Sequence, residues 1–483
     1  MAEVDYKLLF DIIENDFCYK KTDLGILVTV STADGKEDVS INSDKFISII
    51  TSRYRKQCGM VISTAPIKNC IRSFQGDIVI QQEKVKNPNR YIHRNHEIWI
   101  DSANRADACF IIKNYGLSPF SMGLKAYKHF YKHSKKSVIP LPDTDHADIN
   151  RIFKYCRVPE SERAVFIAYL LTLLISDIEH PCLVINGEQG SGKTTMCIFI
   201  KALIDPVGDN RPNLCPRKES EWVLLFQENY LIAIDNLATI SSSTSDTLCG
   251  YVTGIKERRR KLYTDNETID YDICQPIILN GIHDVIKNED MLSRSIVLTL
   301  EKSENGVNAT DEKASLMEEF KKDCPAIWGG IVNLLSEALG NYKPYIADRY
   351  GRDIRMPAFY DYGYCICEAW EKGQGESFCK RYGALLDSQL KQFEKNPDLV
   401  EVVVFFLEKN DYEWEGTMKG FSMKLNEIVE LADADVKIPS IPNLLSREIN
   451  KLRFEFKKAG VTIEMSKTPN NSRYIRLSLE KTE

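Results

Sequence analysis

A glycine-rich segment that ends in lysine and threonine is the part of this sequence whose residue types most clearly predict chemistry. Residues 187–194 read Gly-Glu-Gln-Gly-Ser-Gly-Lys-Thr and match the phosphate loop G-x-x-x-x-G-K-[ST] at every fixed position. Glycines there let backbone N–H groups turn toward phosphate oxygens. We expect the Lys193 amine to reach the β- and γ-phosphates and the Thr194 hydroxyl to hold Mg²⁺. The predicted binding residues for ATP and Mg²⁺ are Gly187, Glu188, Gln189, Gly190, Ser191, Gly192, Lys193, Thr194 and Thr195.

The elements needed to position this loop are visible on either side of it. The apolar run at 182–186 predicts a buried strand, and 195–203 predicts a helix. Strand, glycine-rich turn and helix form the context that the motif requires, which disfavours a chance match. The N-terminus of the helix adds partial positive charge beside the phosphates.

A carboxylate directly follows the next apolar run, Tyr230–Ile234. Asp235 follows at the position where open α/β sheets bind ligands, so we predict that it holds Mg²⁺ directly or through water. Ring-forming ATPases often have a glutamate at the next position, which polarises the attacking water. Here the residue is Asn236, which cannot act as a base. Either another carboxylate serves or hydrolysis is slow, and the sequence leaves this open.

Two further residues complete the predicted catalytic set. Asn280 ends the strand at 276–280 and is expected to orient the attacking water, although an ordinary strand-end asparagine is the alternative. Arg294 follows in the segment Asp290–Arg294, and could reach the γ-phosphate of a neighbouring subunit as an arginine finger. A surface salt bridge is its alternative role. The predicted catalytic residues are Lys193, Asp235, Asn280 and Arg294.

Basic residues between these strands suit contact with nucleic acid. Arg258, Arg259, Arg260 and Lys261 are consecutive and lie near Tyr263, a combination that favours DNA backbone contact in the pore of a ring. A solvated surface loop is the alternative.

A lysine-rich segment earlier in the chain has two interpretations. Ser121–Lys136 carries five lysines, two histidines and no acidic residue, with aromatic residues between them. It could bind nucleic acid through charge and base stacking. It could equally be a surface helix whose Leu124, Tyr127 and Tyr131 face a core.

The C-terminal residues predict a small separate unit. An apolar helix at 400–407 is followed by a basic helix at 445–459 and by a hairpin with strands at 461–465 and 474–479. A helix followed by a basic-tipped hairpin suggests a winged helix, which usually binds DNA. The predicted DNA-binding residues are Arg258, Arg259, Arg260, Lys261, Arg447 and Lys451.

Length and composition indicate a multidomain globular protein. A chain of 483 residues is too long to fold around one hydrophobic core. Its composition, 43% hydrophobic and 27% charged residues, excludes a largely disordered chain. We predict the α/β class, with a small α+β accessory or collar domain at 1–145, a phosphate-loop ATPase core with a parallel sheet at 146–310, a helical region at 311–395 and a winged-helix DNA-binding domain at 396–483. In the helical region, apolar residues recur at helical spacing: Leu316, Phe320, Ile327, Ile331, Leu334 and Leu335.

Charge and cysteine usage bear on partners and compartment. The net charge of −6 combines basic excesses in 1–145 and 441–483 with an acidic centre, which fits a motor core whose nucleic-acid contacts are confined to particular surfaces. The 14 cysteines contain no Cys-x-x-Cys pair, which favours free thiols over a zinc site or a disulfide framework. No apolar run reaches the length of a membrane span and the first residues do not resemble a secretion signal, so we expect a cytoplasmic protein without membrane contact.

The order of these motifs resembles that of superfamily 3 helicases. It comprises the phosphate loop, Asp235-Asn236, R-K-L-Y-T at 260–264, L-N-G at 279–281 and D-x-x-x-R at 290–294. The similarity is greatest to the primase-helicase C-terminal type of phages, plasmids and other mobile elements. It extends over roughly 90–480 and is firmest at 180–300.

The resemblance implies an ATP-dependent DNA helicase with an AAA+-like core. Such proteins assemble as a ring, usually a hexamer, around single-stranded or forked DNA, with the ATP site between subunits. Whether Arg260 or Arg294 is the arginine finger across that interface is left open by the sequence. Residues 1–90 lack a catalytic carboxylate cluster of the primase type, so we do not predict primer synthesis, and a primase or initiator is a possible separate partner. An ATP-regulated replication initiator, or a defence ATPase without unwinding activity, is the alternative function.

Overall fold

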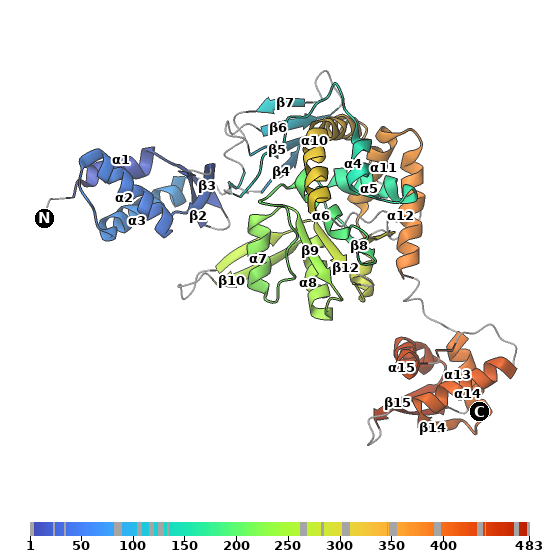
Figure 1. Ribbon diagram of the computed structural model, residues 1–483. Helices are drawn as coiled ribbons and strands as arrows, with labels where there is room; N and C mark the ends of the chain where they lie inside the picture. The colour runs from blue at the N-terminus through green and yellow to red at the C-terminus, as the bar shows by residue number, and fades with distance from the viewer. Residues whose placement is uncertain are drawn as a thin grey trace. The chain divides into compact units, whose positions relative to one another are not determined.

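The computed structural model describes residues 4–480 apart from sixteen internal gaps. These gaps are 23–24, 33–34, 82–88, 104–108, 115–119, 124–129, 133–134, 261–267, 282–284, 302–309, 345, 347–354, 391–397, 432–437, 440 and 468–472. The chain forms two compact units, Met1–Gln389 and Leu390–Glu483 (Figure 1). Among the described residues, no helix combines the length and the apolar character needed to cross a bilayer.

The described residues up to Gln81 form three helices and a small antiparallel sheet. The helices are α1 (Tyr6–Asn15), α2 (Asp44–Cys58) and α3 (Thr64–Gln81), and the sheet has the order β1 (Cys18–Thr22), β2 (Gly25–Thr32), β3 (Gly35–Ser40). The Ser43 hydroxyl caps α2 by accepting from the N–H of Phe46 at 3.2 Å, and α2 ends at Gly59, whose φ of +76° favours glycine. Leu9, Phe46 and Ile50 belong to the buried core that joins these layers.

A four-stranded antiparallel meander follows. Its order is β4 (Tyr91–Arg94), β5 (Glu97–Asp101), β6 (Cys109–Lys113), β7 (Phe120–Gly123). Ile98 and Ile100 of β5, and Phe110 and Ile112 of β6, are buried, so the meander has an apolar face of its own.

The structure describes part of the lysine-rich segment 121–136 and tests its two interpretations there. Residues 121–123 belong to β7 and residues 130–132 and 135–136 are not helical, so the surface helix is wrong for the described part. Lys132 and Lys136 are buried and pair with Asp101 at 3.2 and 3.3 Å, so these two lysines are unavailable to nucleic acid. Lys125, Lys128, Leu124 and Tyr127 lie outside the described residues.

The central part of the first unit is a parallel sheet in the order β13 (Ser295–Leu300), β8 (Cys182–Gly187), β12 (Ile277–Gly281), β9 (Ile232–Leu237). All residues of β12 are buried, as expected for a parallel strand covered on both faces. The predicted α/β class with a parallel sheet is thereby confirmed. The connecting elements are α6 (Lys193–Ile204), α7 (Glu219–Glu228), α8 (Ser242–Thr253), the antiparallel ribbon β10 (Ile255–Arg260) and β11 (Thr268–Ile273), and α9 (Glu289–Leu292).

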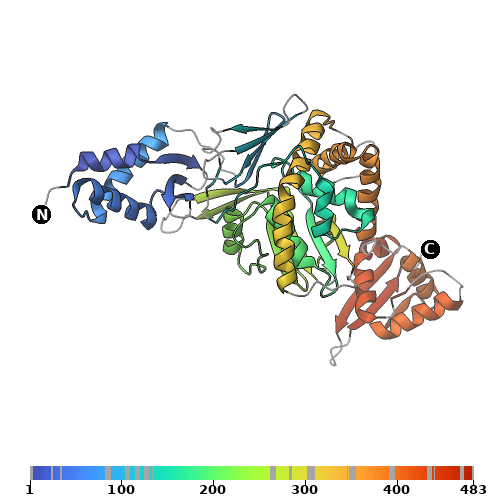
Figure 2. The same cartoon turned by 45° about the horizontal axis from the view of Figure 1, so that its top comes forward.

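Helices precede and follow this sheet in the sequence. Preceding it are η2 (Ile149–Arg151), α4 (Ile152–Tyr155), η3 (Glu160–Glu162) and α5 (Arg163–Thr172); following it are α10 (Thr310–Gly340), α11 (Pro357–Trp370) and α12 (Gln374–Leu390). Helix α10 packs against α4 and α11 (Figures 1 and 2). The predicted stripe is buried at Phe320, Ile327, Ile331 and Leu335, whereas Leu316 and Leu334 are half-buried. At Gly329 an added Cβ would lie 1.8 Å from the Asp143 carbonyl oxygen, so only glycine allows this close packing.

The second unit contains a three-stranded antiparallel sheet and four helices among its described residues. The elements are α13 (Asp398–Glu408), β14 (Glu413–Thr417), α14 (Met418–Leu431), α15 (Pro442–Lys451), α16 (Arg453–Lys458), β15 (Val461–Lys467) and β16 (Arg473–Leu479), with sheet order β14-β16-β15. The predicted hairpin is confirmed. The single helix predicted at 445–459 is wrong, because the chain leaves helical geometry at Leu452, which is fully buried. The break lets Ile449 and Phe456 enter the same core.

Candidate nucleotide site

The phosphate loop connects the carboxyl end of β8 to the start of α6. Gly187, Gly190 and Gly192 have φ of +151°, +86° and +91°, a backbone region that disfavours any side chain. At Gly187 an added Cβ would also lie 2.7 Å from the carbonyl oxygen of Leu300 on β13. The first glycine is therefore required both by the turn and by the neighbouring strand. Glu188, Gln189 and Gly190 are exposed at the open side of the loop.

The Lys193 amine lies over its own loop. Its Nζ donates to the carbonyl oxygens of Gly187 and Glu188, both at 2.7 Å, and the side chain is buried. Burial lowers the pKa of Lys193, and the nearby Asp235 carboxylate opposes this shift. The amine is therefore held at the inner side of the loop, where it can exchange these carbonyl oxygens for phosphate oxygens.

Three polar side chains from different elements meet beside the loop. Because β12 lies between β8 and β9, Asn280 is placed between the phosphate loop and Asp235. The Thr194 hydroxyl lies 3.0 Å from Asp235 Oδ2, and the Asn280 amide nitrogen lies 3.4 Å from the same hydroxyl. The sequence predicted that all three would face one site, and the structure brings them together.

The donor set fits a magnesium ion shared with a nucleotide. Thr194 and Asp235 offer hard oxygen atoms, which Mg²⁺ prefers, and the pair includes a single carboxylate. No group of three or more His, Cys, Asp or Glu side chains suited to a metal occurs in the described part of the chain. Mg²⁺ commonly binds through one or two carboxylates and substrate phosphates rather than in an all-protein cage.

The residue after Asp235 holds the carboxylate but offers no base. Asn236 has a φ of +60°, is exposed, and donates its backbone N–H to Asp235 Oδ1 at 2.7 Å. Both carboxylate oxygens of Asp235 are thus oriented, one by Asn236 and one by Thr194. Left-handed backbone at a non-glycine residue occurs more often for asparagine than for most types.

Asn213 was missed by the sequence reasoning. It forms an isolated parallel bridge to Ile234 at the outer edge of β9, with its N–H 2.7 Å from the Ala233 oxygen. Its carbonyl oxygen accepts the N–H of Asp235 at 2.9 Å. Asn213 therefore fixes the backbone that carries the magnesium ligand. A single bridging residue has no periodicity, so no sequence signal could have found it.

Arg294 lies away from the phosphate loop of its own chain. It directly precedes β13, whose Ser295 pairs with Cys182 at the start of β8, whereas Gly187 lies at the other end of that strand. Its Nη1 pairs with the Asp290 carboxylate and donates to the Asp290 carbonyl oxygen at 2.8 Å. Arg355 lies 3.6 Å from the same carboxylate. Within the described residues, Nε of Arg294 is buried without a hydrogen-bond partner.

The predicted DNA-binding residues lie on two other elements. Arg258, Arg259 and Arg260 belong to strand β10, so their backbone is a strand and not a loop; Arg260 pairs with Thr268 of β11. Lys261 lies outside the described residues. In the second unit, Arg447 is exposed on α15 and Lys451 is the last residue of that helix.

Comparison with known families places the chain among replication proteins. A model described as "Actinomycete integrative conjugative element replication protein" matches residues 149–389, and a second, of the C-terminal domain of the same RepA protein, matches residues 399–483. Together they cover about two thirds of the chain. The chain belongs to this family. The first match contains the phosphate loop and β9, and the second coincides with most of the second unit.

Similarity to individual proteins is low in sequence identity. None of the curated proteins matches the sequence of this replication protein. Similar solved structures include "SCCmec type IV Cch - active helicase", with a TM-score of 0.44, 11% identity, and coverage of 96% of this chain and 93% of that one. They also include the A form apo structure of the NrS-1 C-terminal region, with a TM-score of 0.42, 10% identity and 98% coverage of each chain.

Family membership confirms part of the sequence interpretation. The chain is a replication protein of a mobile element, as the order of its motifs indicated. Its assignment to superfamily 3, its helicase activity and its use of ATP and Mg²⁺ stay predictions.

Proposed function

We propose that this replication protein is an ATP-dependent DNA helicase that unwinds the DNA of its mobile element. The observation that carries the proposal is the convergence of Thr194, Asp235 and Asn280 beside a complete phosphate loop. Lys193 would contact the β- and γ-phosphates, Thr194 and Asp235 would hold Mg²⁺, and Asn280 would orient the attacking water. The bound Mg²⁺ would neutralise charge that develops on the phosphates.

Assembly into a homo-hexameric ring of the superfamily 3, AAA+-like type is the second part of the proposal. Within its own chain Arg294 lies at the end of β13 far from the phosphate loop, so it cannot serve as the finger of that site. The half-exposed Asp290 carboxylate, which pairs with the Arg294 guanidinium, supports a role for Arg294 at the γ-phosphate of a neighbouring subunit.

DNA contacts are assigned to two surfaces. The ribbon β10–β11 carries three consecutive arginines at its end, which supports backbone contact in the ring pore. The order of helices and strands in the second unit, with a basic α15 followed by a hairpin, supports a winged helix that binds DNA through Arg447 and Lys451. We retain the proposed division into accessory domain (1–145), ATPase core (146–310), helical region (311–395) and winged helix (396–483).

One observation favours a second candidate function. Asn236 occupies the position where a catalytic base would be expected, and its amide cannot accept a proton from water. A protein with this site could bind ATP mainly to assemble on DNA, as a replication initiator or as a defence ATPase without unwinding activity.

Unwinding of a forked DNA duplex with ATP and Mg²⁺ separates these functions. A helicase releases the labelled strand with wild-type protein and fails to do so with Lys193→Ala or with a non-hydrolysable ATP analogue. ATP-dependent assembly on the fork without strand release would support the initiator. Strand release by Lys193→Ala at the wild-type rate would contradict the helicase assignment.

A further inference from the structure

The end of α6 opposite the phosphate loop is tied to the beginning of β9 by buried side chains. Lys201 Nζ donates to Asn229 Oδ1 at 2.8 Å and to the Leu231 carbonyl oxygen at 2.9 Å. Asp205 caps the helix, and its Oδ2 accepts the N–H groups of Tyr230 at 2.8 Å and of Leu231 at 3.1 Å. These four hydrogen bonds fix the position of the end of α6 relative to the start of β9.

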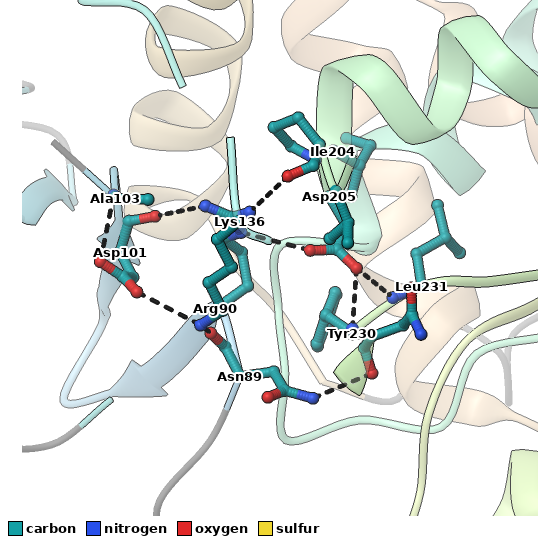
Figure 3. Close-up of polar contacts among 12 residues, drawn as sticks. Asn89, Arg90, Asp101, Ala103, Lys136, Ile204, Asp205, Tyr230 and Leu231 are labelled. Atoms are coloured by element: carbon teal, nitrogen blue, oxygen red, sulfur yellow. Dashed lines mark hydrogen bonds and ion pairs between the residues drawn. The ribbon is translucent and has the colours of Figure 1, made fainter. Parts of the chain in front are cut away.

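A residue from upstream of the ATPase core completes this cluster. Figure 3 shows Arg90 between Asp205 and Asp101, with Asn89 beside it. Arg90 Nε lies 3.2 Å from Asp205 Oδ1, and its two terminal nitrogens donate to the carbonyl oxygens of Asp101 and Pro206, both at 3.0 Å. Residues 89 and 90 precede β4 and lie outside the family match that begins at residue 149.

Asn89 makes a second connection to the same place. Its side-chain amide donates to the carbonyl oxygens of Phe226 at 3.0 Å and of Asn229 at 2.9 Å, at the end of α7. Lys136, which follows the meander, donates to the Asn89 carbonyl oxygen and pairs with Asp101. The two residues that precede the meander thus contact both the end of α6 and the chain that enters β9.

Every charged group of the cluster is removed from water. Arg90 is 0%, Asp205 1% and Lys201 2% exposed. Burial alone would raise the pKa of Asp205, but Lys201, Arg90 and the Leu231 N–H outweigh it, so the pKa lies below its usual value. Breaking a buried pair by removing one partner leaves an uncompensated buried charge and is strongly destabilising, which favours the arrangement found here.

Helix α6 and strand β9 are therefore joined at both ends. At one end the Thr194 hydroxyl meets Asp235, the pair predicted to hold Mg²⁺. At the other end Lys201 and Asp205 meet residues 229–231. The helix between them is about 18 Å long at 1.5 Å per residue and is hydrogen-bonded along its length, so we expect a shift of one end to displace the other. A small misplacement of reacting groups can cost as much as about a hundredfold in rate.

We infer that Arg90, Lys201, Asp205 and Asn229 form a positioning cluster, which sets the separation of Thr194 and Asp235 and so the affinity for the magnesium–nucleotide complex. The inference rests on the proposed nucleotide binding by this site. It also makes the segment that carries Arg90 a working part of the ATPase.

The test uses the full chain and a fluorescent ATP analogue, titrated with Mg²⁺ and with EDTA. Asp205→Asn removes the charge but keeps the shape of the side chain. We expect the Mg²⁺-dependent affinity to fall about tenfold, while the affinity in EDTA changes less than about threefold. Arg90→Lys keeps the charge and loses contacts to carbonyl oxygens, and we expect an intermediate loss. It replaces Asp205→Asn in the test if that variant does not fold.

Asp38→Asn is the matched control. Asp38 is a buried carboxylate that pairs with Lys20 at 2.6 Å and accepts the N–H of Lys132 at 3.0 Å. Both partners precede the ATPase core in the chain, whereas α6 and β9 lie within that core. The Asp38→Asn variant should leave the Mg²⁺-dependent affinity within about twofold of wild type. An unchanged affinity in folded Asp205→Asn and Arg90→Lys, or an equal loss in Asp38→Asn, would overturn the inference.

A second measurement separates this inference from the proposed function. Amide hydrogen exchange of residues 188–196 without nucleotide should be faster in Asp205→Asn than in wild type or Asp38→Asn. If wild-type protein binds no nucleotide, the proposed function fails, and exchange still reports on the cluster. Unchanged exchange at 188–196 in Asp205→Asn would contradict the positioning role.

Discussion

Arg294 gives the sharpest prediction because its own chain cannot use it at the nucleotide. Ser295 and Leu300 pair with Cys182 and Gly187, and Arg294 precedes Ser295, so Arg294 is about 20 Å along the sheet from its own phosphate loop at 3.3 Å per residue. This distance exceeds the reach of an arginine side chain. If Arg294 acts on the γ-phosphate, it must act on that of a neighbouring subunit.

Mixing two inactive variants tests this directly. Arg294→Ala and Lys193→Ala should each lower ATP turnover by at least about a thousandfold, the range found for arginine fingers and essential phosphate contacts. In an equal mixture, about one quarter of head-to-tail interfaces combine an intact Lys193 with an intact Arg294. Steady-state hydrolysis should therefore recover to about a quarter of the wild-type rate if the sites act independently. Adding increasing amounts of Lys193→Ala to wild-type protein tests that independence, because turnover falls in proportion to the fraction of variant if the sites act independently.

The structure supplies a control for the ion pair. Arg355 lies 3.6 Å from the same Asp290 carboxylate and has a half-exposed side chain, so Arg355→Ala removes one partner of Asp290 and leaves Arg294 in place. We expect Arg355→Ala to keep turnover within about threefold of wild type, as for most exposed ion pairs. If the mixture shows only the sum of its two components while the addition of Lys193→Ala to wild type shows independent sites, the assignment of Arg294 to a neighbouring site is refuted.

Three further predictions concern the loop, a buried histidine and the basic ribbon. Gly187→Ala should lower the unfolding free energy by about 3 kcal/mol and Gly190→Ala by about 1 kcal/mol in urea denaturation, because only the first adds a backbone clash to the unfavourable φ; equal losses would contradict this. Burial lowers the pKa of His180 to about 4, so as the pH falls below 6.5 the unfolded chain takes up a proton on this residue before the folded chain does. The folded state therefore loses about 3 kcal/mol of stability between pH 6.5 and 4. His180→Gln should flatten the stability profile over this range, and an unchanged profile would exclude the effect. Reversing the charge of Arg259 and Arg260 should reduce the slope of log K against log salt for DNA binding by about 2, whereas an unchanged slope would assign them no phosphate contact.

The sequence predicted the parts of the site that depend on local pattern. Residues 187–194 are contiguous and their glycines demand one backbone path, so the loop and its flanking elements followed directly. Asp235 and Asn280 each end an apolar run, and the carboxyl ends of parallel strands share one edge of the sheet. Their convergence with Thr194 was therefore predictable without knowing any distance.

Long-range pairing accounts for what the sequence did not predict. Arg90 and Asp205 are 115 positions apart, and no periodicity relates them. Lys132 and Lys136 looked like surface charges until the fold placed Asp101 between them. Arg258–Arg260 looked like a loop because strand pairing with β11 is decided by the partner and not by composition.

Steady-state ATP hydrolysis with and without single-stranded DNA tests the central claim most directly. We predict hydrolysis by wild-type protein that requires Mg²⁺, rises at least about tenfold with DNA, and is abolished in Lys193→Ala. Hydrolysis that ignores DNA, or that persists in Lys193→Ala, would contradict the assignment of a DNA motor powered at this phosphate loop.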